Sequence, residues 1–261
     1  MKELNLLSYE LERDESLLIK SSANLHLKEN KDLNINILLD LSNDSNIDIS
    51  LGSYSKLKLV LISLSKNIDY KLNIKLENSA NLSLFLVDLS DGKLESEKVV
   101  ELNGENAEFS LYEYVSTKGN ETQNGRVEVV HNAKNTISNS KLIYLAKGDS
   151  LITKKAISKI NKGMDNSTAS ENIRGIILGD DARIIAEPIL VIDHDDVHAS
   201  HGCAIGTLDD NEIYYLMSRG LSRDEAIKII CASLINPIIK AIDDKEFLDF
   251  VEPYLIKSVE A

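Results

Sequence analysis

The feature that most constrains this fold is a recurring alternation of apolar and polar residues in short segments. In residues 33–41 every odd position is apolar, and in residues 68–76 every even position is apolar. A period of two is typical of a strand with one buried face. Segments 56–64 and 81–89 begin with alternation and then become apolar at both parities, which predicts strands covered on both faces.

The strands restart near residues 33, 47, 57, 68 and 82, and no helical pattern interrupts them. Turn-forming residues lie between them, at 43–46, 52–53 and 78–81. This spacing fits a sandwich, a barrel or a solenoid. Stackable aliphatic residues, Asn near the turns, and few Asn-Gly hairpin signals favour a right-handed parallel β-helix slightly over a sandwich.

The composition changes near Leu208, where a helical pattern begins. Acidic residues in 209–212 suit a first helical turn, because they complement the helix dipole. Gly220 lies where a left-handed C-terminal cap belongs. Ser222 and Glu225 have the spacing of a capping box that opens a second helix.

The remaining chain predicts further helix. Pro237 is expected to begin another helical piece, and residues 245–258 a helix bent or broken near Pro253. The chain therefore divides into a β-helix core over 1–207 and a small C-terminal α-helical unit over 208–261.

Charge and composition restrict the classes of partner. The net charge of −13 argues against nucleic-acid binding and against docking on an anionic membrane. No apolar run approaches the roughly 20 residues of a membrane helix, and the N-terminus lacks the layout of a secretory signal. Two cysteines without a CxxC spacing make a disulfide framework improbable. We expect a cytoplasmic protein with free thiols.

Three histidines, His194, His198 and His201, would share one face of a helix and suggest a zinc site. The local sequence is poor in helix formers. On a strand, His194 and His198 would lie about 13 Å apart, too far to share an ion. A three-histidine site is therefore disfavoured, and these two are expected to be exposed strand or turn residues.

His201 is a stronger candidate. It lies between two small residues, at the expected corner between strand and helix, where a ligand or a partner chain could reach it. Its imidazole can ligate iron, and Cys203 shares its face in an extended chain and offers a soft thiolate. The alternatives are a buried His201 bonded to backbone and a Cys203 that acts as a small apolar residue. Cys231 is expected in the core, and His131 in a structural role.

The first two predicted helices carry side chains of the types enriched at protein interfaces. Alternatively, Tyr214 and Met217 pack the helices onto the end of the β-helix. The residues of this candidate docking surface are Tyr214, Tyr215, Met217, Arg219 and Arg223.

A set of acids between residues 180 and 196 invites a second hypothesis, a β-helix polysaccharide lyase or hydrolase. Asp is also favoured in turns for structural reasons. A third hypothesis is a purely structural β-solenoid. The chain lacks a Walker motif, a dinucleotide glycine pattern, a nucleophile elbow and HExxH. The acids concerned are Asp180, Asp181, Asp193, Asp195 and Asp196.

Segments 196–203 and 214–226, read with 178–182 and 187–188, resemble the C-terminal core of the SufB/SufD family. The resemblance is clear over about residues 126–234. It implies a parallel β-helix, which decides the fold, and a non-enzymatic scaffold for iron–sulfur cluster assembly in the SUF system. The family usually carries an extra N-terminal region, whereas strands here are expected from about Leu25, so the chain resembles a reduced version.

The resemblance also implies a site and partners. His201 matches a family histidine at the interface between two β-helices, and the following Gly202 is typical of the SufD branch. Iron or a nascent cluster would be held transiently there, with Cys203 as an additional candidate. The partners implied are a SufB-like or identical chain, in a homo- or heterodimer, and the ABC-type ATPase SufC. SufC would dock on the C-terminal helices. Whether the chain is of SufB type, SufD type or a minimal homodimeric scaffold stays open.

Overall fold

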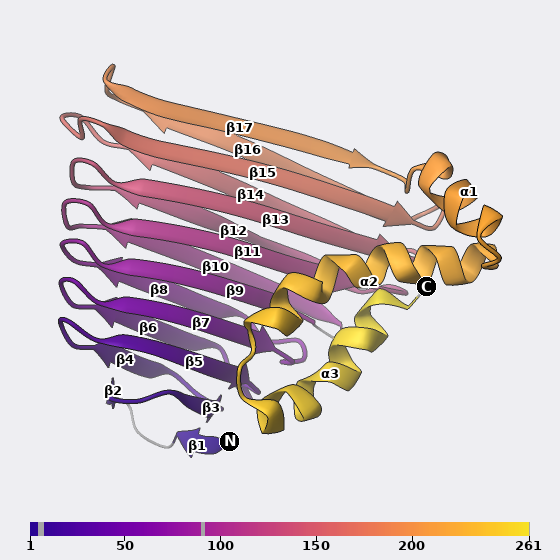
Figure 1. The fold of residues 1–261 in the computed structure, drawn as a ribbon, viewed down its shortest axis with the longest axis horizontal. Helices are drawn as coiled ribbons and strands as arrows, with labels where there is room; N and C mark the ends of the chain where they lie inside the picture. Colours follow the sequence, from indigo (N-terminus) through magenta and orange to yellow (C-terminus); the bar gives the residue numbers. More distant parts are fainter. Residues whose placement is uncertain (5–7, 90–91, 261) are drawn as a thin grey trace.

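A computed structural model describes residues 1–4, 8–89 and 92–260, and it shows a parallel β-helix followed by helices (Figure 1). In these residues the odd-numbered strands form one nine-stranded sheet, sheet A, and the even-numbered strands form an eight-stranded sheet, sheet B. Sheet A contains β1 (Lys2–Leu4), β3 (Glu15–Ile19), β5 (Asp32–Leu39), β7 (Lys56–Ser63), β9 (Asn81–Asp88), β11 (Glu108–Thr117), β13 (Ile137–Lys147), β15 (Ser167–Leu178) and β17 (Val197–Gly206). Sheet B contains β2 (Ser8–Leu11), β4 (Ala23–Leu27), β6 (Ser45–Leu51), β8 (Tyr70–Leu76), β10 (Lys93–Leu102), β12 (Thr122–His131), β14 (Leu151–Ile160) and β16 (Arg183–Ile192).

The chain alternates between the two sheets, so that each coil adds one strand to each of them in parallel. This confirms the predicted β-helix. The prediction that strands begin near Leu25 is wrong, because β1 already begins at Lys2 and pairs with β3. The early strands have three to five residues, too few for a period of two to stand out.

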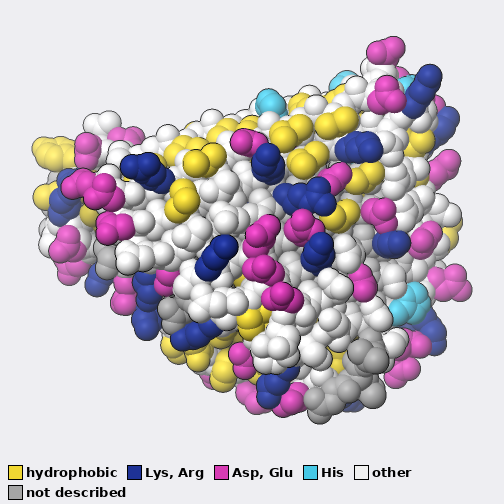
Figure 2. All heavy atoms as spheres, turned by 180° about the vertical axis from the view of Figure 1, so that it is seen from behind, with side chains coloured by type: hydrophobic (Ala, Val, Ile, Leu, Met, Phe, Trp, Pro, Cys, Tyr) yellow, Lys and Arg dark blue, Asp and Glu magenta, His cyan; other side chains and the backbone are white. Residues whose placement is uncertain are grey.

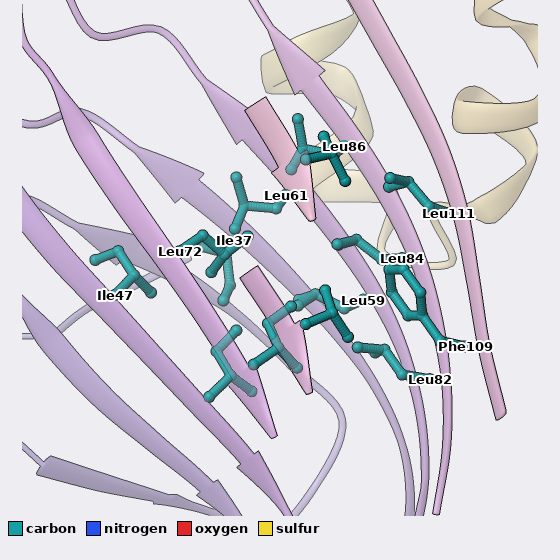
Figure 3. Packing of buried hydrophobic residues seen from close by; sticks show 14 of the residues in the cluster. Ile37, Ile47, Leu59, Leu61, Leu72, Leu82, Leu84, Leu86, Phe109 and Leu111 are labelled. Carbon is teal, nitrogen blue, oxygen red and sulfur yellow. The ribbon is translucent and has the colours of Figure 1, made fainter. Parts of the chain in front are cut away.

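The interior between the sheets is an aliphatic stack in the first coils (Figure 3). Leu59, Leu84 and Leu111 are register partners on β7, β9 and β11, and all three are buried. Each coil thus covers the apolar face of the coil before it, and removing a methylene group from water stabilises by about 0.8 kcal/mol. The apolar face of a coil is therefore buried only when the next coil stacks on it.

One column of turns connects sheet B to sheet A, and Asn recurs in it. Asn106, Asn135 and Asn166 have φ values of 59°, 57° and 57°, in the left-handed region that Asn tolerates better than most residues. The amide of Asn106 donates to the carbonyl of Lys134, and that of Asn135 to Asp165, each one coil further on. The Asn-rich segments of the sequence therefore join successive coils.

Three helices follow: α1 (Asp210–Ser218), α2 (Arg223–Ala241) and α3 (Lys245–Val259). The predicted capping box is present, since Ser222 and Glu225 bond reciprocally at the start of α2. Pro237 lies inside α2 and does not begin a separate helical piece, so that expectation is wrong. Pro253 lies inside α3, which runs from Lys245 to Val259 without a break. Buried apolar residues on both sides of each proline hold the helix together despite the missing backbone bond.

Helices α2 and α3 lie across sheet A (Figure 1). Their cover explains why strands of this sheet carry apolar side chains on both faces. Val60 and Ile62 of β7 and Val87 of β9 belong to the same buried cluster as residues of these helices. The outer face of sheet A is thus a second core, as the sequence predicted for segments 56–64 and 81–89. Sheet B has no such cover in the described residues, and its outer face carries intermixed Lys, Arg, Asp and Glu (Figure 2).

Candidate functional site at the open end of the β-helix

The last coil, formed by β16 and β17, ends both sheets in the part of the chain that the structure describes. Side chains of this coil that face the interior have no further coil above them. Ile192 of β16 and Ile205 of β17 remain 37% and 39% exposed, whereas their partners Ile160 and Gly175 lie one coil deeper. Figure 2 shows hydrophobic side chains along this rim. This open end combines unpaired strand edges with apolar surface, a combination that favours association.

His201 lies in the middle of β17 and not at a strand–helix corner, which corrects the prediction. The strand continues to Gly206, because pairing with β15 runs unbroken from Ser167–Val197 to Ile176–Gly206. Its register partner is Glu171, an interior residue of β15, so His201 is on the interior side of the last coil. His201 is exposed, and the alternative of a buried histidine is therefore wrong.

Cys203 has the same parity as His201 and pairs with the buried Ile173, so both residues face the open end from one strand. Its thiol is free and exposed. Partial burial, and then the negative charge of Glu171, raise the pKa of the Cys203 thiol. The thiol is therefore protonated at neutral pH, and it would ligate a metal only by losing that proton.

Glu171 is the residue of this region that the sequence analysis missed. Its side chain is 3% exposed, and Oε2 accepts a hydrogen bond of 3.1 Å from Ser158. The other oxygen, Oε1, is buried without a partner in the described residues. Burial raises the pKa of Glu171 to about 7. The only signal in the sequence is its parity: Glu171 alternates with Ala169 and Ile173, two interior positions.

Deeper in the interior lies a network of buried charges. Lys98 Nζ lies 2.7 Å from Asp88 Oδ2 and 2.8 Å from Glu113 Oε1, and all three side chains are almost fully buried. Tyr70 donates to Asp88, and Tyr144 to Glu113. The interior therefore changes from aliphatic in the first coils to polar toward the open end.

Lys154 extends this polar network by one coil. Its Nζ lies 3.0 Å from Ser96 Oγ and 3.3 Å from the carbonyl oxygen of Asn124. Burial, together with the nearby charge of Lys98, lowers the pKa of Lys154 to about 8. Its register partner on β16 is Ala186 of the last coil. The polar part of the interior thus reaches to within one coil of the open end.

Two other histidines, His194 and His131, have structural partners. His194 Nε2 lies 2.6 Å from Asp165, which also pairs with Lys134 at a turn. His131 is buried and bonds Thr136 and Ser138, which confirms its structural role. Burial lowers the pKa of His131 to about 4, so it is neutral at physiological pH.

The acids behind the lyase hypothesis lie in and beside the turns that follow β15 and β16. Asp180, Asp181, Asp193, Asp195 and Asp196 are exposed. Over the described ranges, no three His, Cys, Asp or Glu side chains stand together closely enough to hold a metal ion as they are.

The candidate docking surface on α1 and the start of α2 is exposed. Tyr214 and Tyr215 are 74% and 57% exposed, and Met217 is exposed as well, so Tyr214 and Met217 do not pack the helices onto the β-helix. The guanidinium of Arg219 lies 5.2 Å from the ring centre of Tyr215, and Arg223 lies 3.5 Å from Asp210 on the surface. Cys231 is buried in α2, as predicted.

A groove of about 500 Å³ lies beside these residues, between α1, α2 and sheet A. Exposed apolar side chains border it, among them Ile229, which is 48% exposed. Its lining residues are Arg174, Asn211, Glu212, Tyr215, Leu216, Ile229, Ile230 and Ser233. None of the helices described is both long and apolar enough to span a bilayer.

Comparison with known proteins gives one family match. Residues 19–234 match the family described as "SUF system FeS cluster assembly, SufBD core domain". The match includes the open end of the β-helix, α1 and the first part of α2, whereas α3 lies outside it.

Individual relatives agree with this match. The iron–sulfur cluster assembly protein SufD of Bacillus subtilis (strain 168) is 28% identical over 172 residues, which cover 66% of this chain and 38% of the relative. SufD of Escherichia coli (strain K12) is 26% identical over 147 residues, or 56% of this chain and 34% of that protein. A SufBD family protein of Pyrococcus horikoshii is 40% identical over 67 residues, or 26% of this chain and 15% of its own length. The chain thus spans well under half the length of these relatives.

Proposed function

Since this chain belongs to the SufBD core family of the SUF iron–sulfur cluster assembly system, we propose that it is a non-catalytic scaffold subunit on which clusters form. The single observation that supports this most directly is the position of His201. It is exposed on the interior side of the last coil, with Cys203 beside it on the same strand. The cargo would be ferrous iron and a nascent cluster. Imidazole and thiolate are suitable ligands for both.

The open end would bind a second β-helix, either a SufB-like chain or another copy of this one. Apolar side chains of β16 and β17 are exposed there, and within the described part of the chain both strands have a free edge. A partner chain could add backbone hydrogen bonds to these edges and cover the apolar surface. His201 and Cys203 would then lie at the subunit interface, where a partner completes the ligand set.

The second proposed contact is with a SufC-like ABC ATPase, through α1 and the start of α2. Tyr215 and Arg219 contact each other on the surface, and the groove beside them is bordered by apolar residues. Aromatic and arginine side chains of this kind often dominate binding energy at interfaces. Helix α2 also packs on sheet A, so a pull on this surface would be transmitted to the β-helix.

Co-purification with the cognate ATPase tests the docking proposal. Tyr215→Ala combined with Arg219→Glu is expected to weaken the complex at least about tenfold without changing the melting temperature. Tyr54→Ala combined with Lys28→Glu is the matched control, because both residues are exposed and neither lies on the helices. Unchanged binding of the first variant would reject the helices as the docking surface.

Cluster formation tests the role of His201. His201→Ala is expected to leave the ATPase complex intact and to reduce the brown chromophore formed during anaerobic reconstitution with iron and sulfide. His198→Ala, three residues earlier on the same strand and of opposite parity, is the control. Equal chromophore in wild type and His201→Ala would show that the open end is not the assembly site.

A further inference from the structure

Glu171 is a buried carboxylate with an unused oxygen, and it lies at the open end. The side chain is 3% exposed, yet among the residues that the structure describes only Oε2 has a hydrogen-bond partner, Ser158. Leaving a buried polar oxygen unsatisfied costs about 1–3 kcal/mol. A glutamate at this position is better explained if a cation contacts Oε1 when the protein holds its cargo.

The register places Glu171 directly below His201 and diagonally below Cys203. Glu171 pairs with His201, and Ile173 pairs with Cys203. Paired positions on neighbouring parallel strands lie about 4.8 Å apart, and alternate residues along one strand about 6.6 Å apart. The three side chains therefore belong to one patch on the interior side of β15 and β17, with Glu171 one coil deeper.

We infer that Glu171 is a third ligand, beside His201 and Cys203, for the iron or nascent cluster at the open end. This inference rests on the proposed function. The set of carboxylate, imidazole and thiolate suits ferrous iron. The three groups are not gathered around one point in the described structure, so Glu171 must turn about its side-chain torsions toward β17 when the metal binds.

Each chain would thus contribute ligands from two coils, and the deeper one is shielded from water. An exposed histidine and cysteine alone would hold a metal weakly and exchange it readily. A buried carboxylate adds negative charge where the surrounding dielectric is low, which strengthens attraction for a cation. Glu171 would then determine how firmly the chain holds iron before a partner closes the site.

Cobalt(II) is a suitable probe because it occupies iron sites and absorbs in the visible when ligated. The full-length, reduced chain would be titrated anaerobically with Co(II), and d–d bands and thiolate-to-cobalt absorption recorded. Wild type is expected to bind one equivalent, and Glu171→Gln to bind at least about tenfold more weakly. Glu171→Asp, which keeps a carboxylate, is expected to retain part of the affinity and shift the d–d bands.

Glu187→Gln is the control, since this carboxylate lies on the outer face of β16 and pairs with Lys155. Wild-type affinity and spectrum in Glu171→Gln would overturn the inference, and so would the absence of cobalt bands in wild type. Co(II) binding that depends on Glu171, in a chain that fails to bind the ATPase, would support the metal site and reject the scaffold assignment. If the chain binds the ATPase but Glu171→Gln binds Co(II) as wild type does, the scaffold assignment is supported and the role of Glu171 as a ligand is rejected.

Discussion

Lys98 and Asp88 form an ion pair of 2.7 Å that is sealed inside the β-helix. Glu113 accepts a second bond from the same ammonium group, and Tyr70 and Tyr144 occupy the remaining carboxylate oxygens. Burial disfavours the charge on Asp88, but Lys98 and Lys154 outweigh it and lower the pKa of this carboxyl. The network therefore stays ionised, and each charge depends on its partners.

Removing Lys98 should be strongly destabilising. Lys98→Met preserves the volume but leaves two buried carboxylates without their main cation, which typically costs about 3–5 kcal/mol. Lys75→Met is the matched control, because Lys75 pairs with Glu101 on the surface. An exposed pair contributes about 1 kcal/mol or less. Urea denaturation at neutral pH gives the free energy of unfolding of both variants. Equal losses of this free energy in the two variants would contradict the assigned role of the network.

Gly104 is required by the stacking of two turns. A Cβ at this position would lie 1.9 Å from the backbone nitrogen of Asn78, in the turn one coil earlier. Gly104→Ala must push these turns apart, and we expect a loss of about 1–3 kcal/mol. At Gly206 an added Cβ meets nothing within 4 Å, so Gly206→Ala should change stability by about 0.5 kcal/mol at most. Thermal melts of both variants give the comparison, and an unaffected Gly104→Ala would disprove the close approach.

Helix α3 is expected to contribute to stability although it lies outside the family match. Phe247 is 1% exposed in the cluster that α3 shares with sheet A, whereas Phe250 is 47% exposed on the same helix. Phe247→Ala should cost about 3–5 kcal/mol. Phe250→Ala should cost much less, because little surface is lost from the core. Similar denaturation midpoints for the two variants would show that α3 is not firmly docked.

The parts of this fold that follow a local pattern could be predicted from sequence. Alternation in residues 33–41 and 68–76 marks β5 and β8, and the capping box marks the start of α2. Apolar residues at both odd and even positions of segment 56–64 predicted that both faces of this strand are covered. Choosing the β-helix over a sandwich needed the family resemblance, because both folds use the same alternating strands.

The site was predicted only in part, because no single segment of the sequence shows which residues of neighbouring coils lie side by side. His201 and Cys203 were identified, but His201 was placed at a corner between strand and helix, whereas β17 continues to Gly206. Glu171 lies 30 positions earlier, and only the register of β15 with β17 brings it under His201. The Lys98 network was missed for the same reason: its members come from separate coils, and each alone resembles an exposed charge.

Glu171 should give stability a pH dependence that its amide variant lacks. Burial raises the folded-state pKa of Glu171 to about 7, above the ordinary value of 4.5 expected when the chain is unfolded. Between these values the folded chain binds the extra proton, so its stability falls as pH rises from about 5 to 7 and levels off above that. In Glu171→Gln this contribution is absent.

The measurement is the free energy of unfolding at pH 5, 6, 7 and 8 for wild type and Glu171→Gln. The difference between them isolates the contribution of Glu171, because every other titratable group is present in both proteins. Glu171→Gln should gain stability relative to wild type as pH rises, with most of the change complete by pH 8. A difference that stays constant across the series would mean that Glu171 is ionised throughout, with its charge already compensated by a partner in the chain.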